Sequence, residues 1–212
     1  LKELKPDRLE DLISMNALFR PGPMEYIPSY IRRKHGQEDV VYDIPEMKEI
    51  LEETFGITVY QEQVMLLAQQ LANFTKGDAD VLRKAMGKKD KKVLDTLKDK
   101  FMDGIRANSH DEKKANKVWS DWEAFAAYAF NKSHSTCYAY VAYQTAYLKA
   151  NYLPEFMAAN LKHQGNIEKI TLYMEQCKSS NLNVLGPDVN ESKIYFAVSK
   201  TGTIRFGLSS IK

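Results

Sequence analysis

The sequence predicts a mainly α-helical protein with several helices and a small β-hairpin region at its C-terminal end. Apolar residues recur every three or four positions through most of the chain, which is typical of amphipathic helices. Prolines and glycines separate these segments where helices would start and end. From about residue 184 two β-rich segments flank a loop that contains Gly202. We therefore expect a helical domain over residues 1–183 and a truncated β-containing segment over residues 184–212.

Helical periodicity and the turn residues place the individual elements. Helices are expected over residues 7–19, 28–36, 46–55, 60–74, 81–86, 91–108, 111–130, 135–152, 154–161 and 167–177. Gly77 is expected to interrupt the helical pattern, with Asp78 or Asp80 capping the helix that follows. Residues 57–60 are expected to form an extended lead-in. Trp119 and Trp122 share one helical face and are expected in the core.

Composition narrows the class of protein. A hydrophobic content of 44% is enough for a packed core. The chain has no apolar run near the roughly 20 residues of a membrane span, and its start does not resemble a signal peptide. Cys137 and Cys177 lie outside any metal-binding spacing. We expect a soluble cytoplasmic protein, and the ends of the sequence suggest a fragment of a longer one.

The densest positive charge follows Gly77. Between Arg83 and Lys100 basic residues outnumber acidic ones by eight to three. A helix could bind successive phosphates through Arg83, Lys84 and Lys88. The planar arginine side chain offers paired N–H donors, and lysine offers a mobile point charge. Most charged runs are simply solvated helix faces, and charge alone favours that interpretation. A metal site at Asp78 and Asp80 is disfavoured because a spacing of two separates them around a helix.

The central stretch, FAAYAFNKSHSTCY (residues 125–138), places four polar side chains together at a junction between two helical patterns: Asn131, Lys132, Ser133 and His134. Such a junction can aim several side chains at one ligand, and the amides that open the next helix favour an anion. An amide, a cation, a hydroxyl and an imidazole beside aromatic rings suit a nucleotide. The alternative is a loop in which Ser133 or Ser135 caps a helix, and composition does not separate the two. The tyrosines of the following helix are expected to pack rather than to stack on bases.

Several segments together resemble the C-family of bacterial replicative DNA polymerases, the polymerase III α subunits. They are ALFRPGP (17–23), RKHG (33–36), FGITVYQEQVM (55–65), GDADVLRKAMGKK (77–89), FAAYAFNKSHSTCYAYVAYQTAYLKANYLPEFMAA (125–159) and PDVN (187–190). The resemblance covers nearly the whole chain in the order of the family. It implies the fingers domain, a mostly helical body that holds the incoming deoxynucleoside triphosphate (dNTP) against the template.

The resemblance also implies roles for particular residues. It puts Arg83 and Lys84 on the triphosphate with Lys88 nearby, and Tyr128 and residues 131–134 at the nucleotide. His134 is the candidate for excluding the ribose 2′-hydroxyl, and Arg20 for supporting the site. DNA contacts are expected from Lys89, Lys91 and Lys92. The family commonly has a second arginine at position 84, and glycines where this chain has Ala127 and Ala129.

The sequence offers no convincing set of carboxylates for two-metal nucleotidyl transfer. In the family the catalytic aspartates belong to the palm, so we expect Mg²⁺ to bind outside this chain, no cofactor within it, and no catalytic residue here. The implied partners are a primer-template, dNTP, the palm and thumb of the same polypeptide, and the sliding clamp and other replisome subunits; no membrane partner is expected. One alternative is a non-catalytic helical module that binds nucleic acid through residues 76–100, and another is a purely structural interaction domain.

Overall fold

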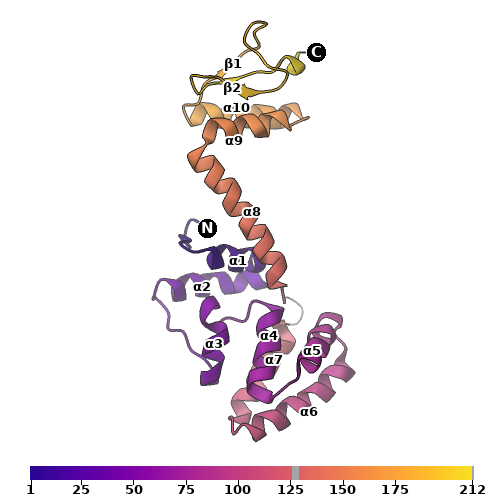
Figure 1. Ribbon diagram of the computed structural model, residues 1–212. Coiled ribbons are helices and arrows are strands. Elements are labelled where there is room, and N and C mark those ends of the chain that lie inside the picture. Colours follow the sequence, from indigo (N-terminus) through magenta and orange to yellow (C-terminus); the bar gives the residue numbers. More distant parts are fainter. Residues whose placement is uncertain (126–128, 212) are drawn as a thin grey trace. The chain divides into compact units, whose positions relative to one another are not determined.

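The computed structural model describes residues 1–125 and 129–211 and confirms a mainly helical fold with a small sheet near the C-terminal end (Figure 1). Contacts between residues divide the chain into two compact units, Leu1–Tyr140 and Val141–Lys212. The division falls within helix α8 (Lys132–Asn151), well before residue 184, where the sequence pattern changes. None of the described helices is long and apolar enough to cross a membrane.

The elements follow the expected order. The first unit contains α1 (Leu9–Leu18), η1 (Pro23–Tyr26), α2 (Ile27–Lys34), η2 (Pro45–Met47), α3 (Lys48–Leu51), η3 (Glu52–Thr54), α4 (Gln61–Ala72), α5 (Lys76–Lys88), α6 (Lys91–Ala107), α7 (Glu112–Phe125) and the start of α8, where η denotes a 3-10 helix. The second contains the rest of α8, α9 (Leu153–Lys162), α10 (Ile167–Ser179), β1 (Val184–Leu185), β2 (Ala197–Val198), β3 (Ile204–Arg205) and η4 (Leu208–Ser210).

Helix α5 begins before Gly77, so the predicted interruption was wrong. Thr75 is the N-cap: its hydroxyl oxygen accepts a hydrogen bond from the Asp78 N–H at 3.1 Å, and the Asp78 carboxylate accepts one from the Thr75 N–H at 2.9 Å. This capping box satisfies two backbone donors, which outweighs the helix propensity lost at Gly77. Hydrogen bonds from Lys100 and Thr75 lower the pKa of Asp78 to about 2. Asp78 therefore takes part in the cap, whereas Asp80 does not.

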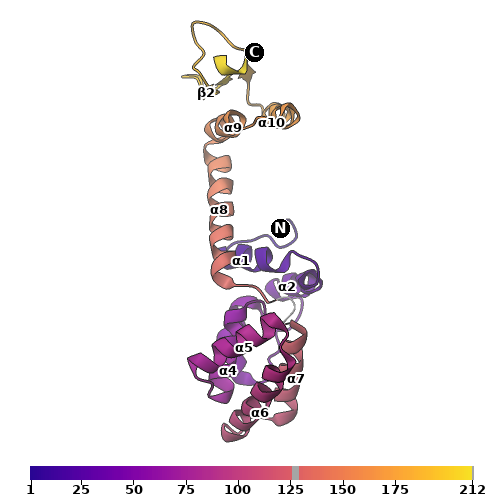
Figure 2. The same cartoon turned by 90° about the vertical axis from the view of Figure 1, so that its right-hand side faces the viewer.

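Helices α4 to α7 pack around one apolar core (Figure 2). Trp119 and Trp122 of α7 are buried in it, as predicted, and each ring centroid lies 5.2 Å from that of Phe101 on α6. Gly104 lets α6 approach the end of α4 closely, because a Cβ atom there would lie 2.1 Å from the carbonyl oxygen of Ala72. The same core holds α5, the basic helix that carries Arg83 and Lys84, against α4 and α6 and so fixes its position.

A second cluster of buried residues joins α1 and α2 to the segment before α4 and to the start of α8. Residues 57–60 are extended, as expected, and lead directly into α4. The Tyr60 hydroxyl lies 3.0 Å from Ser14 Oγ, and burial raises the pKa of Tyr60 well above its usual range. The buried Asp11 carboxylate accepts a hydrogen bond from Lys34 Nζ at 2.7 Å, which compensates its charge.

The second unit has a core of its own, formed by α9, α10 and a three-stranded sheet. The strand order is β1-β3-β2: β2 and β3 form the antiparallel hairpin that the sequence predicts, and β1 adds in parallel to β3. The parallel strand was not predicted. Helix α9 packs on β2, and α10 packs on α9 and β1. Buried side chains of this core include Cys177 and Ile204.

Helix α8 begins at Lys132, three residues earlier than expected, so Ser133 and His134 lie in its first turn. Ser135 is buried and caps nothing, because its hydroxyl donates to the Ile13 carbonyl at 2.6 Å. The expected packing of the tyrosines was wrong, since they are between 49% and 59% exposed: Tyr138, Tyr140, Tyr143, Tyr147 and Tyr152. Only Ser135 and Ala139 are buried among the residues of this helix.

Candidate functional site

Helix α5 presents Arg83 and Lys84 side by side, and both contact one carboxylate. Asp80 Oδ1 accepts hydrogen bonds from Arg83 Nε at 3.1 Å and from an Arg83 terminal nitrogen at 2.8 Å. Asp80 Oδ2 lies 2.7 Å from Lys84 Nζ. Hydrogen bonds from Lys84 and Arg83 lower the pKa of Asp80. The predicted cations are therefore held together on one helix face, and Asp80 belongs to the site.

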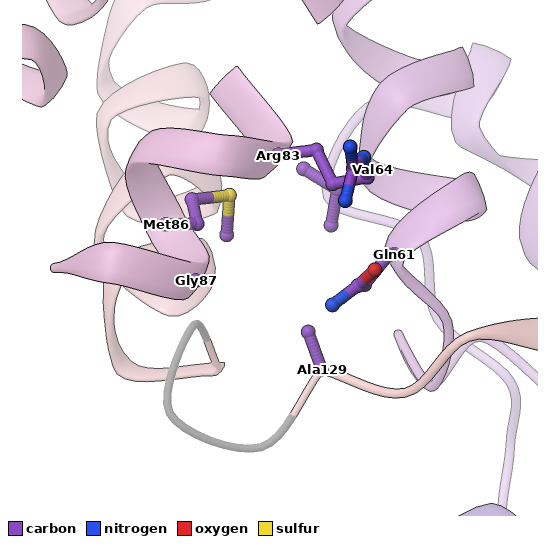
Figure 3. A pocket seen from close by; sticks show the side chains of 6 residues that line it. All are labelled: Gln61, Val64, Arg83, Met86, Gly87 and Ala129. Carbon is purple, nitrogen blue, oxygen red and sulfur yellow. The ribbon is translucent and has the colours of Figure 1, made fainter. Parts of the chain in front are cut away.

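Arg83 also lines a small pocket that reaches the central stretch (Figure 3). Helix α5 contributes Arg83, Met86 and Gly87 to the pocket. Helix α4 supplies Gln61 and Val64 on the other side, and Ala129 closes it from the central stretch. The structure thus brings the basic helix and the central stretch together, although more than 40 residues of sequence separate them. Tyr128, the residue before Ala129, lies outside the described residues.

The start of α4 fixes the backbone of the central stretch. The Gln61 N–H donates to the Phe130 carbonyl at 2.9 Å, and Tyr60 forms an isolated parallel bridge with Phe130. Because Tyr60 is fully buried, this contact ties the central stretch to the core. Gln61 was not predicted as a site residue. Its side-chain amide offers a donor and an acceptor in the pocket.

The amides at the N-terminus of α8 are already occupied by side chains of this chain. Asn131 Oδ1 accepts the His134 N–H at 2.8 Å, which makes Asn131 the N-cap. Glu62 on α4 accepts from Asn131 Nδ2 at 2.7 Å through one carboxylate oxygen and from the Lys132 N–H at 2.9 Å through the other. In this structure the Glu62 carboxylate thus takes the place that an anionic ligand would have at these amides.

Lys132 is anchored as well. Its Nζ lies 2.7 Å from both carboxylate oxygens of Glu53 and 5.5 Å from the ring centroid of Tyr60. Both side chains of the Lys132–Glu53 pair are about one-third exposed. Lys132 and Asn131 thus hold the central stretch against η3 and α4, while Ser133 and His134 face solvent.

An aromatic series connects Arg20 to the first turns of α8. The Arg20 guanidinium carbon lies 4.5 Å from the Phe130 ring centroid, a cation–π distance. The His134 ring follows at 5.5 Å from Phe130, and Tyr138 at 4.7 Å from His134. Burial lowers the pKa of Arg20. The predicted residues Arg20 and His134 are therefore joined through Phe130, and Tyr138 extends the same surface.

The remaining lysines form an exposed corner between two helices. Lys88 ends α5, Lys89 adopts a left-handed conformation with φ of 55°, and Lys91 and Lys92 begin α6. All four are exposed. Asp90 in their midst caps α6 by accepting the Val93 N–H at 3.3 Å. The corner is continuous with the C-terminal end of the helix that carries Arg83.

The site also contains residues that sequence analysis missed: Glu53, Gln61, Glu62 and Asp80. Only Asp80 carries a local signal, because it lies three and four residues before its two cations. Within the part of the chain that the structure describes, no group of three His, Cys, Asp or Glu side chains is arranged to hold a metal ion.

Residues 1–109 match the family model of the bacterial DNA polymerase III alpha subunit finger domain. The chain belongs to this family. It is 46% identical over 214 residues to DNA polymerase III subunit alpha of Aquifex aeolicus, 48% over 213 residues to that of Treponema pallidum, and 48% over 212 residues to that of Chlamydia muridarum. Each alignment covers 100% of this chain but only 17% or 18% of the relative's length.

The finger-domain match includes Arg20 and all of α4, α5 and α6. The central stretch lies beyond residue 109 but within the alignments to the DNA polymerase III alpha subunits. Both sides of the pocket therefore fall in sequence shared with these polymerases.

Proposed function

We propose that this chain is the part of a replicative DNA-directed DNA polymerase that binds the incoming dNTP and contacts the primer-template. The observation that carries the proposal is the pocket in which Arg83 of α5 meets Gln61 of α4 and Ala129 of the central stretch. Arg83 makes one side of this pocket cationic, and on the other side the chain continues from Ala129 to the rings of Phe130 and His134. A nucleoside triphosphate has the matching pattern of charge along its length.

In this proposal Arg83 and Lys84 neutralise the triphosphate, and Lys88 adds charge at the end of the same helix. Arginine can give two parallel hydrogen bonds to phosphate oxygens, while lysine contributes a point charge. The sugar and base lie toward His134, beside the surface that Arg20 supports through Phe130. Asn131 and Lys132 act through the loop that they anchor. These residues contribute positioning and charge stabilisation to nucleotidyl transfer.

The full-length polymerase is proposed to use Mg²⁺, but the described residues do not fit a magnesium site. Two-metal transfer needs carboxylates that hold both ions, and those described here form no such group. By analogy with the family, we propose that the ions and the catalytic aspartates belong to the palm, outside this chain. Palm, thumb, sliding clamp and other replisome subunits are the proposed partners, and this chain by itself is proposed to be inactive.

Replacing His134 by alanine is expected to lower discrimination against ribonucleotides in the full-length polymerase. The imidazole is exposed on the first turn of α8, between Phe130 and Tyr138, so its removal opens space beside the proposed sugar position. We expect the ratio of kcat/KM for dNTP over the ribonucleotide to fall roughly tenfold. Single-nucleotide incorporation measures the ratio, and Gln144→Ala, an exposed change on the same helix, is the control. An unchanged ratio would place the sugar contact elsewhere.

The exposed lysine corner also supports the second candidate function, a helical module that binds nucleic acid without a nucleotide pocket. The deciding experiment measures primer-template affinity and apparent dNTP affinity side by side in the full-length polymerase. A Lys91→Ala, Lys92→Ala variant is expected to weaken primer-template binding and to reduce its salt-dependence slope by about two. Its apparent dNTP affinity should not change, because these side chains point from the first turn of α6 and do not line the pocket.

The matched control is Lys113→Ala, Lys114→Ala, which removes two exposed lysines from the first turn of α7. The control should leave both affinities unchanged. If the lysine-corner variant and an Arg83 variant both change primer-template affinity and leave the apparent dNTP affinity unchanged, the chain is the nucleic-acid-binding module without a nucleotide pocket. If the corner alters neither affinity, its assignment to DNA is wrong.

A further inference from the structure

We propose that Asp80 is an internal counter-ion, which holds Arg83 and Lys84 until a triphosphate displaces it. The inference rests on the proposed nucleotide site and adds a residue that sets the selectivity of its cationic end. Both carboxylate oxygens of Asp80 are engaged: Oδ1 by two nitrogens of Arg83 at 2.8 and 3.1 Å, and Oδ2 by Lys84 Nζ at 2.7 Å. One negative charge is thus shared by two positive ones on the same face of α5.

Helix stability does not account for this carboxylate. The amides at the start of α5 are capped by Thr75 and Asp78, so Asp80, in the second turn, has no capping role. Its ion pairs with Arg83 and Lys84 are partly exposed, with 38% of the Asp80 side chain accessible, and pairs of this kind stabilise a helix only slightly. Aspartate is also a poorer helix former than most residues. The main physical effect of Asp80 is therefore on the charge and orientation of its two partners.

Replacement of Asp80 by a polyphosphate as the partner of Arg83 and Lys84 is favourable because of the charge and the oxygen atoms of the polyphosphate. A triphosphate carries several negative charges and many acceptor oxygens, so it can replace both carboxylate oxygens at once. Inorganic phosphate offers fewer charges for the same exchange. Asp80 and its two cations are attached to the same helix, so the local concentration of the carboxylate around Arg83 and Lys84 is high. An anion that binds these cations weakly therefore displaces Asp80 poorly. Competition from Asp80 should therefore make Arg83 and Lys84 bind polyphosphates in preference to small anions.

The test uses the full-length polymerase with Asp80→Asn, which keeps the size of the side chain and removes its charge. The probes are a dNTP, inorganic tripolyphosphate and inorganic phosphate. The apparent Kd for the dNTP, from single-turnover incorporation, is expected to fall roughly three- to tenfold, because two weak ion pairs no longer compete. The inhibition constant of inorganic phosphate should fall by a larger factor than that of tripolyphosphate, so that the preference for tripolyphosphate over phosphate narrows.

Asp95→Asn is the matched control, since it removes the same charge from an exposed position on α6. It should change neither constant. Asp80→Ala, which favours the helix more than asparagine does, should act in the same direction as Asp80→Asn. In an Arg83→Ala background the gain from Asp80→Asn should shrink, because one of the released cations is missing.

A weaker dNTP affinity in Asp80→Asn would overturn the inference, because Asp80 would then orient Arg83 for binding instead of competing with the ligand. Unchanged constants would overturn it too. Both outcomes are separable from failure of the proposed nucleotide site. That site fails if Arg83→Ala alone leaves the nucleotide kinetics as they are, whatever Asp80 does.

Discussion

Arg83→Ala is expected to raise the apparent Kd of the full-length polymerase for dNTP by roughly ten- to a hundredfold. Hydrogen bonds from a charged donor to a charged acceptor contribute about 1.5 to 3 kcal/mol, and each 1.4 kcal/mol is tenfold in affinity. We expect an increase in the lower part of this range, because Arg83 must break its ion pair with Asp80 before it binds a phosphate. Single-turnover incorporation at varied dNTP concentration measures the change. Primer-template affinity should stay constant, since Arg83 lies on the pocket and not at the exposed lysine corner.

The matched variant Arg83→Lys separates charge from shape. Lysine retains the positive charge but loses the planar fork, so its apparent Kd should lie between those of the parent enzyme and Arg83→Ala. Neither change threatens folding, because Arg83 is partly exposed on α5 and alanine and lysine are good helix formers. Equal dNTP affinity in all three proteins would show that the guanidinium is merely solvated and would remove the phosphate assignment.

Features of the fold that depend on neighbouring residues were predictable from the sequence. The predicted helix over residues 91–108 closely matches α6, because apolar residues repeat along it and Asp90 precedes it. The error at Gly77 is local as well: Thr75 and Asp78 form a capping box, and that signal is stronger than one glycine near a helix start. Likewise Asn131 caps α8, which moves its beginning to Lys132.

The assembled site was predictable only in part, because its contacts join distant segments. Periodicity identifies Arg83 and Lys84 as cations on one helix, but no local pattern indicates that Glu62 receives Asn131 and the Lys132 N–H. Those contacts span about 70 residues of sequence and follow from the packing of α4 against the central stretch. The same cause applies to the α8 amides: the start of a helix is expected to attract an anion, and only the fold shows that the Glu62 carboxylate is there.

Gly104→Ala is expected to destabilise the pairing of α4 and α6 by about 3 kcal/mol. The new Cβ would lie 2.1 Å from the Ala72 carbonyl oxygen, 2.6 Å from its carbonyl carbon and 2.7 Å from its Cα. These are backbone atoms, so no side-chain rotation relieves the contact and the helices must move apart. Hydrogen exchange of α4 and α6 amides in the full-length polymerase measures the effect, and their protection should fall by roughly a hundredfold.

Gly77→Ala is the matched control for this prediction, because its Cβ would lie 3.7 Å from the nearest atom, the Thr75 hydroxyl oxygen, which is an ordinary contact. It should leave protection unchanged or raise it slightly. A double variant, Gly104→Ala with Ala72→Gly, should stay destabilised, because removing the Ala72 methyl group leaves the clashing backbone in place. Recovery in the double variant would mean that side-chain packing, and not the approach of the two backbones, requires glycine at 104.

Since α5 packs on both α4 and α6, a shift of these helices should also weaken dNTP binding through Arg83. Gly104→Ala therefore links the close crossing in the core to the geometry of the proposed phosphate end.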